Sequence, residues 1–143
     1  MADAGLVDSA VMSVLANDAT LAGYCPNGVY YGVAPPGSTA FVTVDLMDHV
    51  DRPGLDSVTL LERGLYMVKA VLLTASATPA RLAAARIHEL LDHVTLDLAS
   101  AGYVPMVCRR IERYRKVEVD PVDKSARWQH QGGTYEVSSY EGS

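Results

Sequence analysis

The segment that most constrains the fold of this chain is a long apolar stretch near its middle. Residues Leu60–Thr74 are mostly apolar, and Lys69 is the only charge in the second half of the stretch. The preceding segment Ala40–Met47 alternates between apolar and polar residues, which is typical of a half-buried strand. Because a short connection joins the two segments, we expect an antiparallel pair, with 60–74 near the middle of a sheet.

Two segments near the start of the chain have helical signals. Asp3–Leu15 repeats apolar residues at the i, i+3, i+4 and i+7 spacing, which predicts an amphipathic helix. A short helical turn is expected over Asp18–Ala22, because Asn17 or Asp18 can accept a hydrogen bond at its N-cap. Gly23 is expected to end that turn. The repeating apolar residues of the first helix are Val7, Ala10, Val11 and Val14.

A longer second helix is predicted from its start signal and its apolar stripe. Thr78 is expected at the N-cap and Pro79 at the first helical position, where the missing proline N–H costs nothing. Gly102 is expected to end the helix. The stripe consists of Ile87, Leu90, Leu91, Val94 and Leu98.

The remaining segments predict further strands and two polar loops. Strands are expected over Val29–Val33, Pro105–Lys116 and Thr134–Tyr140, and loops over Asp48–Asp56 and Asp120–Gln131. Together the elements predict an α+β fold. We expect a single layer of mostly antiparallel sheet with four or five strands, and both helices packed on one face. The whole chain of 143 residues is expected to form one domain.

The charge is unevenly distributed along the chain. The sequence has 12 Lys and Arg against 17 Asp and Glu, for a net charge of −5. Residues 1–51 contain six acids and no Lys or Arg, whereas seven of the twelve basic residues fall within 109–127. This asymmetry favours self-association in which the basic segment of one copy contacts the acidic surface of another. The alternative is an ordinary solvated face.

Several classes of protein are not expected from this sequence. Residues 2–22 contain no Lys or Arg, so we expect no secretory signal. Glycines and prolines interrupt the longest charge-free stretch, between Asp18 and Asp45, so we expect no membrane-spanning helix. With only two cysteines, Cys25 and Cys108, no disulfide framework is available. No glycine-rich phosphate loop or nucleophile elbow occurs.

The nearest approach to a catalytic motif begins at His88-Glu89. A zinc-protease helix needs a second histidine four residues after the first, but Asp92 stands there and His93 comes one residue later. We therefore expect a solvated helix face with two i, i+4 pairs, His88–Asp92 and Glu89–His93. The alternative is a small metal-dependent hydrolase using His88, Glu89 and Asp92, which would need another ligand from elsewhere.

Acidic residues also gather at the end of the second predicted strand. Asp45, Asp48, His49 and Asp51 lie close enough in sequence to suggest a divalent cation site. However, the regular spacing of a calcium loop is missing, and Arg52 follows directly. A solvated or subunit-contacting loop is the favoured interpretation.

The most basic segment is the predicted strand that begins near Arg109. Simple alternation places Arg109, Arg113 and Arg115 on one face, and Arg110 and Lys116 on the other. A nucleic-acid-binding surface gathers its basic residues on one face, so a charge divided between two faces of an acidic protein argues against nucleic acid binding. Cross-strand ion pairs or a seam between subunits fit the pattern better.

The order of the elements resembles a known family. The relevant segments are Val14–Ala22, Asn27–Pro35, Ala40–Val44 and, after the second helix and the basic strand, Gly132–Val137. Over about residues 6–140, this order resembles the tail-terminator, or tail-completion, proteins of long-tailed bacteriophages and phage-like particles. One departure is visible: a proline commonly opens the second strand in that family, and here Ala40 does.

The resemblance implies a structural protein of the virion with no enzymatic activity and no cofactor or metal. Its copies would form a hexameric ring that caps the tail tube and stops its growth. The ring would contact the tail tube protein and the head–tail connector or stopper protein. DNA would pass through without specific binding, and no membrane would be involved. Such a ring is assembled in the host cytoplasm and remains in the neck of the virion.

Three other interpretations stay open. One is a different neck component, such as a head-completion or stopper protein, and the second is the metal-dependent hydrolase described above. The third is an oligomeric module that binds a small molecule.

If a ring forms, we expect two contact regions, the Asp48–Ser57 loop and the segment Arg109–Gln131. Trp128 is the only tryptophan of the chain, and it could anchor a contact or belong to the core. The candidate interface residues are Asp48, His49, Asp51, Arg52, Arg109, Arg113, Arg115 and Trp128.

Overall fold

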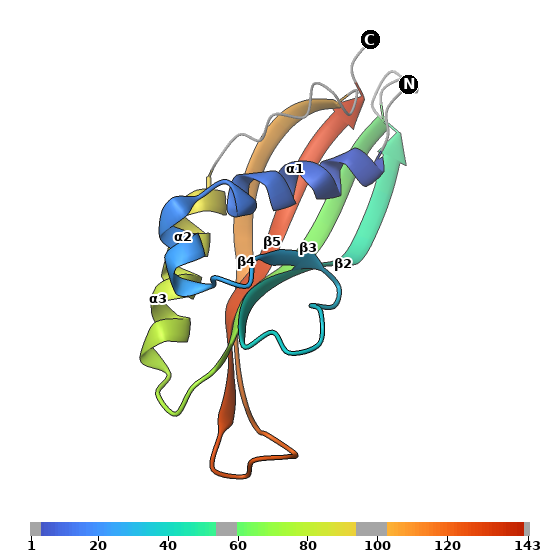
Figure 1. Cartoon of the computed structure of the whole chain (residues 1–143). Coiled ribbons are helices and arrows are strands. Elements are labelled where there is room, and N and C mark those ends of the chain that lie inside the picture. Colours follow the sequence, from blue (N-terminus) through green and yellow to red (C-terminus); the bar gives the residue numbers. More distant parts are fainter. Residues whose placement is uncertain (1–3, 54–59, 94–102, 142–143) are drawn as a thin grey trace.

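A computed structural model of the chain describes residues 4–53, 60–93 and 103–141. Its elements are, in order, α1 (Ala4–Ala16), α2 (Ala19–Tyr24), β1 (Val29–Tyr31), β2 (Ala40–Pro53), β3 (Leu60–Leu73), α3 (Thr78–Leu91), β4 (Tyr103–Val119) and β5 (Arg127–Glu141). The strands form one five-stranded sheet in the order β1-β2-β3-β5-β4, in which only β1 and β2 are parallel. The helices lie on one face of this sheet (Figure 1), which confirms the predicted α+β fold.

The long apolar stretch forms β3 and lies at the centre of the sheet, between β2 and β5. Its antiparallel pairing with β2 is also confirmed, with Ala40 opposite Leu72 and Pro53 opposite Leu60. The predicted loop over Asp48–Asp56 is wrong as far as Pro53, because β2 continues through these polar residues. The backbone of this segment pairs with β3 as far as Pro53 opposite Leu60, so polarity does not end the strand. Residues 54–59 lie outside the described part of the chain.

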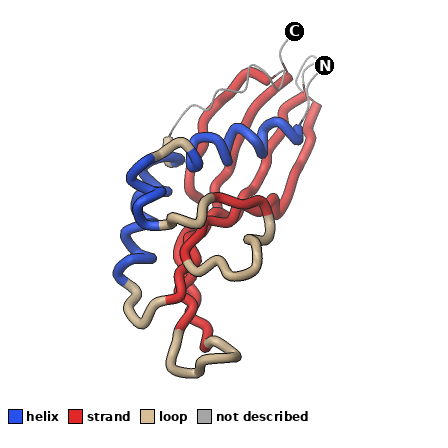
Figure 2. The backbone as a smooth tube through the Cα atoms, in the orientation of Figure 1, coloured by secondary structure: helices blue, strands red, loops and turns tan. Residues whose placement is uncertain are grey.

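The predicted loop Asp120–Gln131 is also too long. Residues Arg127–Gln131 belong to β5, where Arg127 pairs with β4 and residues 128–131 pair with both β3 and β4. Two buried polar side chains here have a partner for the amide nitrogen, whereas Gln129 Oε1 has none among the described residues. Gln129 Nε2 lies 3.4 Å from the Thr74 carbonyl oxygen, and Gln131 Nε2 lies 3.5 Å from that of Ala77. The end of the β4–β5 hairpin projects beyond the rest of the sheet (Figure 2).

The helices begin close to where the sequence predicts. Asp18 is the N-cap of α2, and its Oδ2 accepts a hydrogen bond of 2.8 Å from the Leu21 N–H. Gly23 does not end this helix, which continues to Tyr24. At α3 the start is shifted by one residue: Ala77 is the N-cap, and the predicted cap Thr78 is the first helical residue.

The second helix ends earlier than predicted, at Leu91 instead of near Gly102. Asp92 is extended and His93 is left-handed with φ 58°, so the chain turns away from the helix axis. The His93 N–H donates a hydrogen bond of 2.6 Å to the Cys108 carbonyl oxygen, which ties this turn to β4. The predicted stripe residues Val94 and Leu98 lie outside the described residues.

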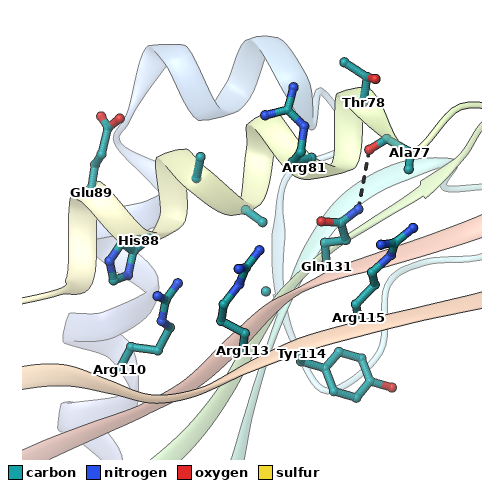
Figure 3. Close-up of a pocket in the computed structure, with 13 residues that line it drawn as sticks. Ala77, Thr78, Arg81, His88, Glu89, Arg110, Arg113, Tyr114, Arg115 and Gln131 are labelled. Carbon is teal, nitrogen blue, oxygen red and sulfur yellow. Dashed lines mark hydrogen bonds between the residues drawn. The ribbon is translucent and has the colours of Figure 1, made fainter.

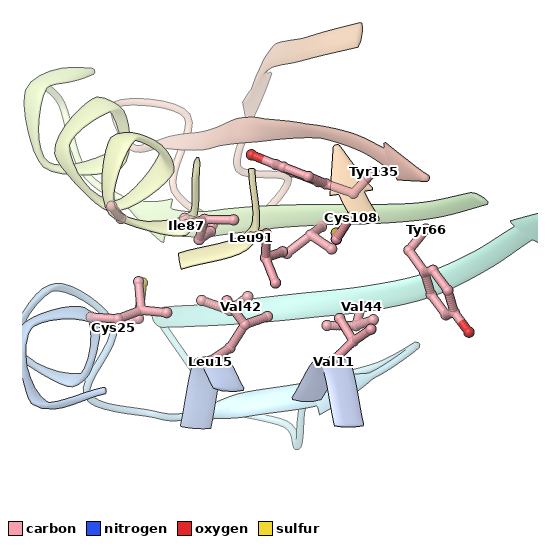
Figure 4. Packing of buried hydrophobic residues seen from close by; sticks show 14 of the residues in the cluster. Val11, Leu15, Cys25, Val42, Val44, Tyr66, Ile87, Leu91, Cys108 and Tyr135 are labelled. Carbon is pink, nitrogen blue, oxygen red and sulfur yellow. The ribbon is translucent and has the colours of Figure 1, made fainter. Parts of the chain in front are cut away.

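The core lies between the helices and the sheet (Figure 4). The predicted stripe of α1 is confirmed, because Val7 and Val11 are buried, while Ala10 and Val14 are partly buried against the core. Burying one large apolar side chain of this kind contributes about 1.5–3 kcal/mol. The fully buried members include Val11, Leu15, Val42, Val44, Val68, Ile87, Leu91, Cys108 and Tyr135.

An ion pair joins α2 to α3. Arg86 Nη2 lies 2.7 Å from Asp18 Oδ1, and Arg86 Nε lies 2.9 Å from Asp18 Oδ2. This two-point contact with Arg86, together with the Leu21 N–H, lowers the pKa of Asp18 from 3.8 to about 2. The carboxylate therefore caps one helix and holds the next.

The Asp18 contact predicts a loss of stability in acid. Since the folded pKa is below the unfolded one, its contribution is full above about pH 5 and disappears as the pH falls towards 2. Urea unfolding between pH 6 and 2 should show a steeper decline for the wild type than for Asp18→Asn. Asparagine keeps a cap acceptor but cannot titrate, so equal slopes for the two proteins would contradict the assignment.

Candidate functional site

A groove runs between α3 and the edge strand β4, with a volume of about 740 Å³. We call it the arginine groove. Its α3 wall is made largely of small residues, Ala77, Ala84 and Ala85, which leaves the space between helix and strand open. Four arginines line it: Arg81, Arg110, Arg113 and Arg115.

A β-bulge decides which arginines face the groove. The register of β4 against β5 shifts between Arg110 and Glu112, so that Ile111 is an extra residue. As a result, Arg110, Arg113 and Arg115 all point towards α3, whereas Tyr114 points away from it (Figure 3).

The predicted grouping of Arg109 with Arg113 and Arg115 is therefore wrong. Simple alternation does not count the extra residue, so it places every residue after Ile111 on the opposite face. Arg109 lies instead near Glu136, with its Nε 3.8 Å from Glu136 Oε1.

Most of the arginines that line the groove form no ion pair with a carboxylate of the described residues. Glu89 is the carboxylate that lines the groove, and its Oε2 lies 2.8 Å from Nη1 of Arg86, which is not a lining residue. Within the described ranges, no carboxylate lies within 4.0 Å of Arg81, Arg113 or Arg115. The groove is therefore a cationic surface on a chain whose net charge is −5.

Two residues of the possible metal motif, His88 and Asp92, connect α3 to the sheet. The predicted His88–Asp92 pair is confirmed, with His88 Nε2 3.4 Å from Asp92 Oδ2. His88 Nδ1 lies 3.3 Å from the Tyr135 hydroxyl, and Asp92 Oδ1 accepts a 3.0 Å hydrogen bond from the Arg110 N–H. That backbone donor lowers the pKa of Asp92, while burial raises the pKa of Tyr135 to about 12.

Two details of this helix face differ from the prediction. His88 and Asp92 are not fully solvated, because their side chains are only 33% and 22% exposed. Glu89 bonds to Arg86 and not to His93, whose Nε2 lies 3.6 Å from Asp92 Oδ2. Within residues 4–53, 60–93 and 103–141, no group of three or more His, Cys, Asp and Glu is placed to hold a metal ion.

The acidic candidates lie along a strand, not in a loop. Asp45, Asp48, His49, Asp51 and Arg52 all belong to β2. β1 pairs with β2 only at residues 42–44, so the outer edge of β2 from Asp45 onward has no strand partner in the described chain. β4 forms the opposite edge of the sheet. An edge strand offers unpaired backbone groups, and these are potential binding surfaces for another chain.

Trp128 lies on β5, where its ring packs against that of Phe41 with a centroid separation of 6.4 Å. Both rings line a second cleft of about 380 Å³, beneath the loop of residues 32–38. Thr43 is 5% exposed in this cleft, and its hydroxyl has no hydrogen-bond partner among the described residues. The ring contact supports a packing role for Trp128.

Both cysteines are free and buried. Desolvation raises the pKa of each thiol to about 12, so neither forms a thiolate at neutral pH. We expect a thiol reagent to leave the native protein unmodified and to label Cys25 and Cys108 fully in denaturant. Mass spectrometry of samples treated in each condition checks this, and rapid labelling of either native thiol would contradict the burial.

No protein-family model matches this sequence, and no curated protein matches it either. Among solved structures, the chain is similar to one described as "Virion of native gene transfer agent (GTA) particle". The TM-score is 0.75, with 21% identity over 97% of each chain. The two chains share a fold. No helix in the described residues is long and apolar enough to cross a membrane.

Proposed function

We propose that this chain is a structural virion protein that acts as a tail terminator. The observation that carries the proposal is the fold likeness to a chain of a gene transfer agent virion, which extends over 97% of both chains. The order of elements in the sequence, which resembles the tail-terminator family, supports the same role. The whole chain then acts as one tail-terminator-like domain.

In this role, identical copies form a hexameric ring on the end of the tail tube. The ring contacts the tail tube protein on one side and the head–tail connector or stopper protein on the other, and DNA passes through it without specific binding. The two free edges of the sheet support such an assembly, because they differ and lie on opposite sides of the chain. A head-to-tail contact between unlike surfaces gives a closed ring when the rotation between copies closes.

The role needs no bound cofactor and no catalysis. The hydrolase alternative has little support from the geometry, because both ring nitrogens of His88 already lie near groups of the chain, Tyr135 and Asp92. The second candidate is another neck component, such as a head-completion or stopper protein. The same fold likeness favours it, since it would also belong to a virion.

The proposal can be tested with the purified chain and its tail tube protein. Light scattering should give a mass of six copies, and adding the ring to polymerising tube protein should shorten the tubes. Images of capped tubes should show the ring at one end. A stopper protein would bind on the head side and leave tube length unchanged. A chain that stays monomeric at all concentrations and does not bind tubes would contradict the proposal.

A further inference from the structure

We propose that the arginine groove is the docking site for the acidic β2 edge of a second copy of this chain. This inference rests on the proposed ring, and it names the contact that joins neighbouring copies. On one copy the site consists of Arg81, Arg113 and Arg115. On the next copy the docking segment is β2 from Asp45 to Asp48.

The groove is open and electrostatically unsatisfied. Arg113 and Arg115 point from β4 towards α3 (Figure 3) and line a space of about 740 Å³, which Arg81 also lines. Within the described residues, none of the three has a carboxylate within 4.0 Å. The alanines of α3 leave this space unfilled. Placing several like charges in one groove is unfavourable unless an anion neutralises them, so the natural occupant carries carboxylates or phosphates.

The acidic edge of β2 cannot reach the groove of its own copy. β2 and β4 are separated by β3 and β5 in the sheet, and each strand spacing is about 4.8 Å. The β2 edge of a molecule therefore lies on the far side from its own groove. A second copy placed beside the first brings the two edges together.

The two edges have complementary charge. The β2 segment carries Asp45 and Asp48, whereas β4 brings Arg110, Arg113 and Arg115 to the groove. Arginine suits such a contact because its planar fork can bind a carboxylate at two points. The outer side of β4 and the outer side of β2 beyond residue 44 have no strand partner in the described residues. The turn at residues 92–93 contacts the outer side of β4 at Cys108 and Arg110, before Arg113 and Arg115.

A nucleic acid phosphate is the competing occupant. The described chain favours carboxylates, because the acidic counterpart is already present on β2 in every copy. The net charge of −5 also repels a polyanion at distances beyond the groove.

Charge reversal tests the contact. Arg113→Glu with Arg115→Glu is expected to raise the concentration for half-assembly about 100-fold or more, because like charges would meet in the contact. Asp45→Arg with Asp48→Arg should do the same. An equimolar mixture of the two variants should reassemble, since each junction between unlike variants has opposite charges. Native mass spectrometry should then find equal numbers of both chains in the complex.

The matched control is Arg109→Glu with Lys124→Glu. It makes the same change in net charge, but Arg109 lies by Glu136 and neither residue lines the groove. Its half-assembly concentration should stay within about threefold of the wild type. Circular dichroism must show that each variant is folded, and Arg113→Gln with Arg115→Gln provides a milder replacement if the glutamates prevent folding.

The outcomes separate this inference from the proposed function. A wild-type ring that tolerates the Arg113 and Arg115 reversals, or variants that fail to reassemble when mixed, would overturn the docking site and leave the ring intact. A wild type that never assembles would overturn the ring itself. A 20-base-pair DNA duplex that binds the wild type but not the arginine variant would assign the groove to nucleic acid instead.

Discussion

Gly132→Ala is expected to lower the free energy of unfolding by about 3 kcal/mol or more. Gly132 lies on β5 opposite Lys69 of β3. A Cβ atom added there would overlap the Val68 carbonyl oxygen and lie 2.5 Å from the Lys69 Cα. These obstacles are backbone atoms of the central strand, so they cannot rotate away as a side chain would. The substitution must therefore push β3 and β5 apart.

Urea or thermal unfolding measures this effect, and the melting temperature should fall by roughly 6–12 °C. The control is Gly23→Ala in α2, where an added Cβ meets no atom within 4 Å. Alanine in a helix should stabilise the protein by about 0.5–1 kcal/mol at that position. If Gly132→Ala unfolds at the same urea concentration as the wild type, the close approach of the two strands is incorrect.

Ile87→Ala has the second largest expected effect, a loss of about 2–5 kcal/mol. Ile87 is 0% exposed and packs on the side of α3 that faces the sheet. Removing three carbon atoms leaves a cavity that the surrounding strands cannot fill without moving.

Leu82→Ala on the same helix is the matched control. Leu82 is 38% exposed, so its truncation should change the stability by less than about 0.5 kcal/mol. Chemical denaturation of both variants gives the comparison. Similar losses for the two would show that α3 is not oriented as described.

The sequence predicts well where local chemistry and long-range packing agree. The apolar stretch Leu60–Thr74 predicts a central strand, and it forms β3 at the centre of the sheet. Asp18 is predicted as an N-cap from the sequence, and it caps α2 in the structure. The errors come from long-range effects. Arg127–Gln131 and the second half of β2 look like loops because they are polar, but strand partners extend the ladder through them.

The candidate site could be predicted only in part. The abundance of arginine around residues 109–115 is visible in the sequence, and so is the acidic character of residues 1–51. The arrangement of the arginines on the two faces of β4 is not visible in the sequence. It depends on a β-bulge with one extra residue, Ile111, whose side chain gives no signal of a bulge. The contribution of α3 to the groove is also hidden, since Arg81 and Arg113 line one groove only when the helix packs on the sheet.

The irregular pairing of the outer strands has a further consequence. β2 has a register shift at Leu46/Asp48 and β4 has one at Arg110/Glu112, whereas the pairing of β3 with β5 is regular throughout. Such shifts bend a strand locally and interrupt the flat row of backbone groups that amyloid growth requires. Because the bends in β2 and β4 interrupt this row, we expect them to disfavour the stacking of copies into fibrils at high protein concentration.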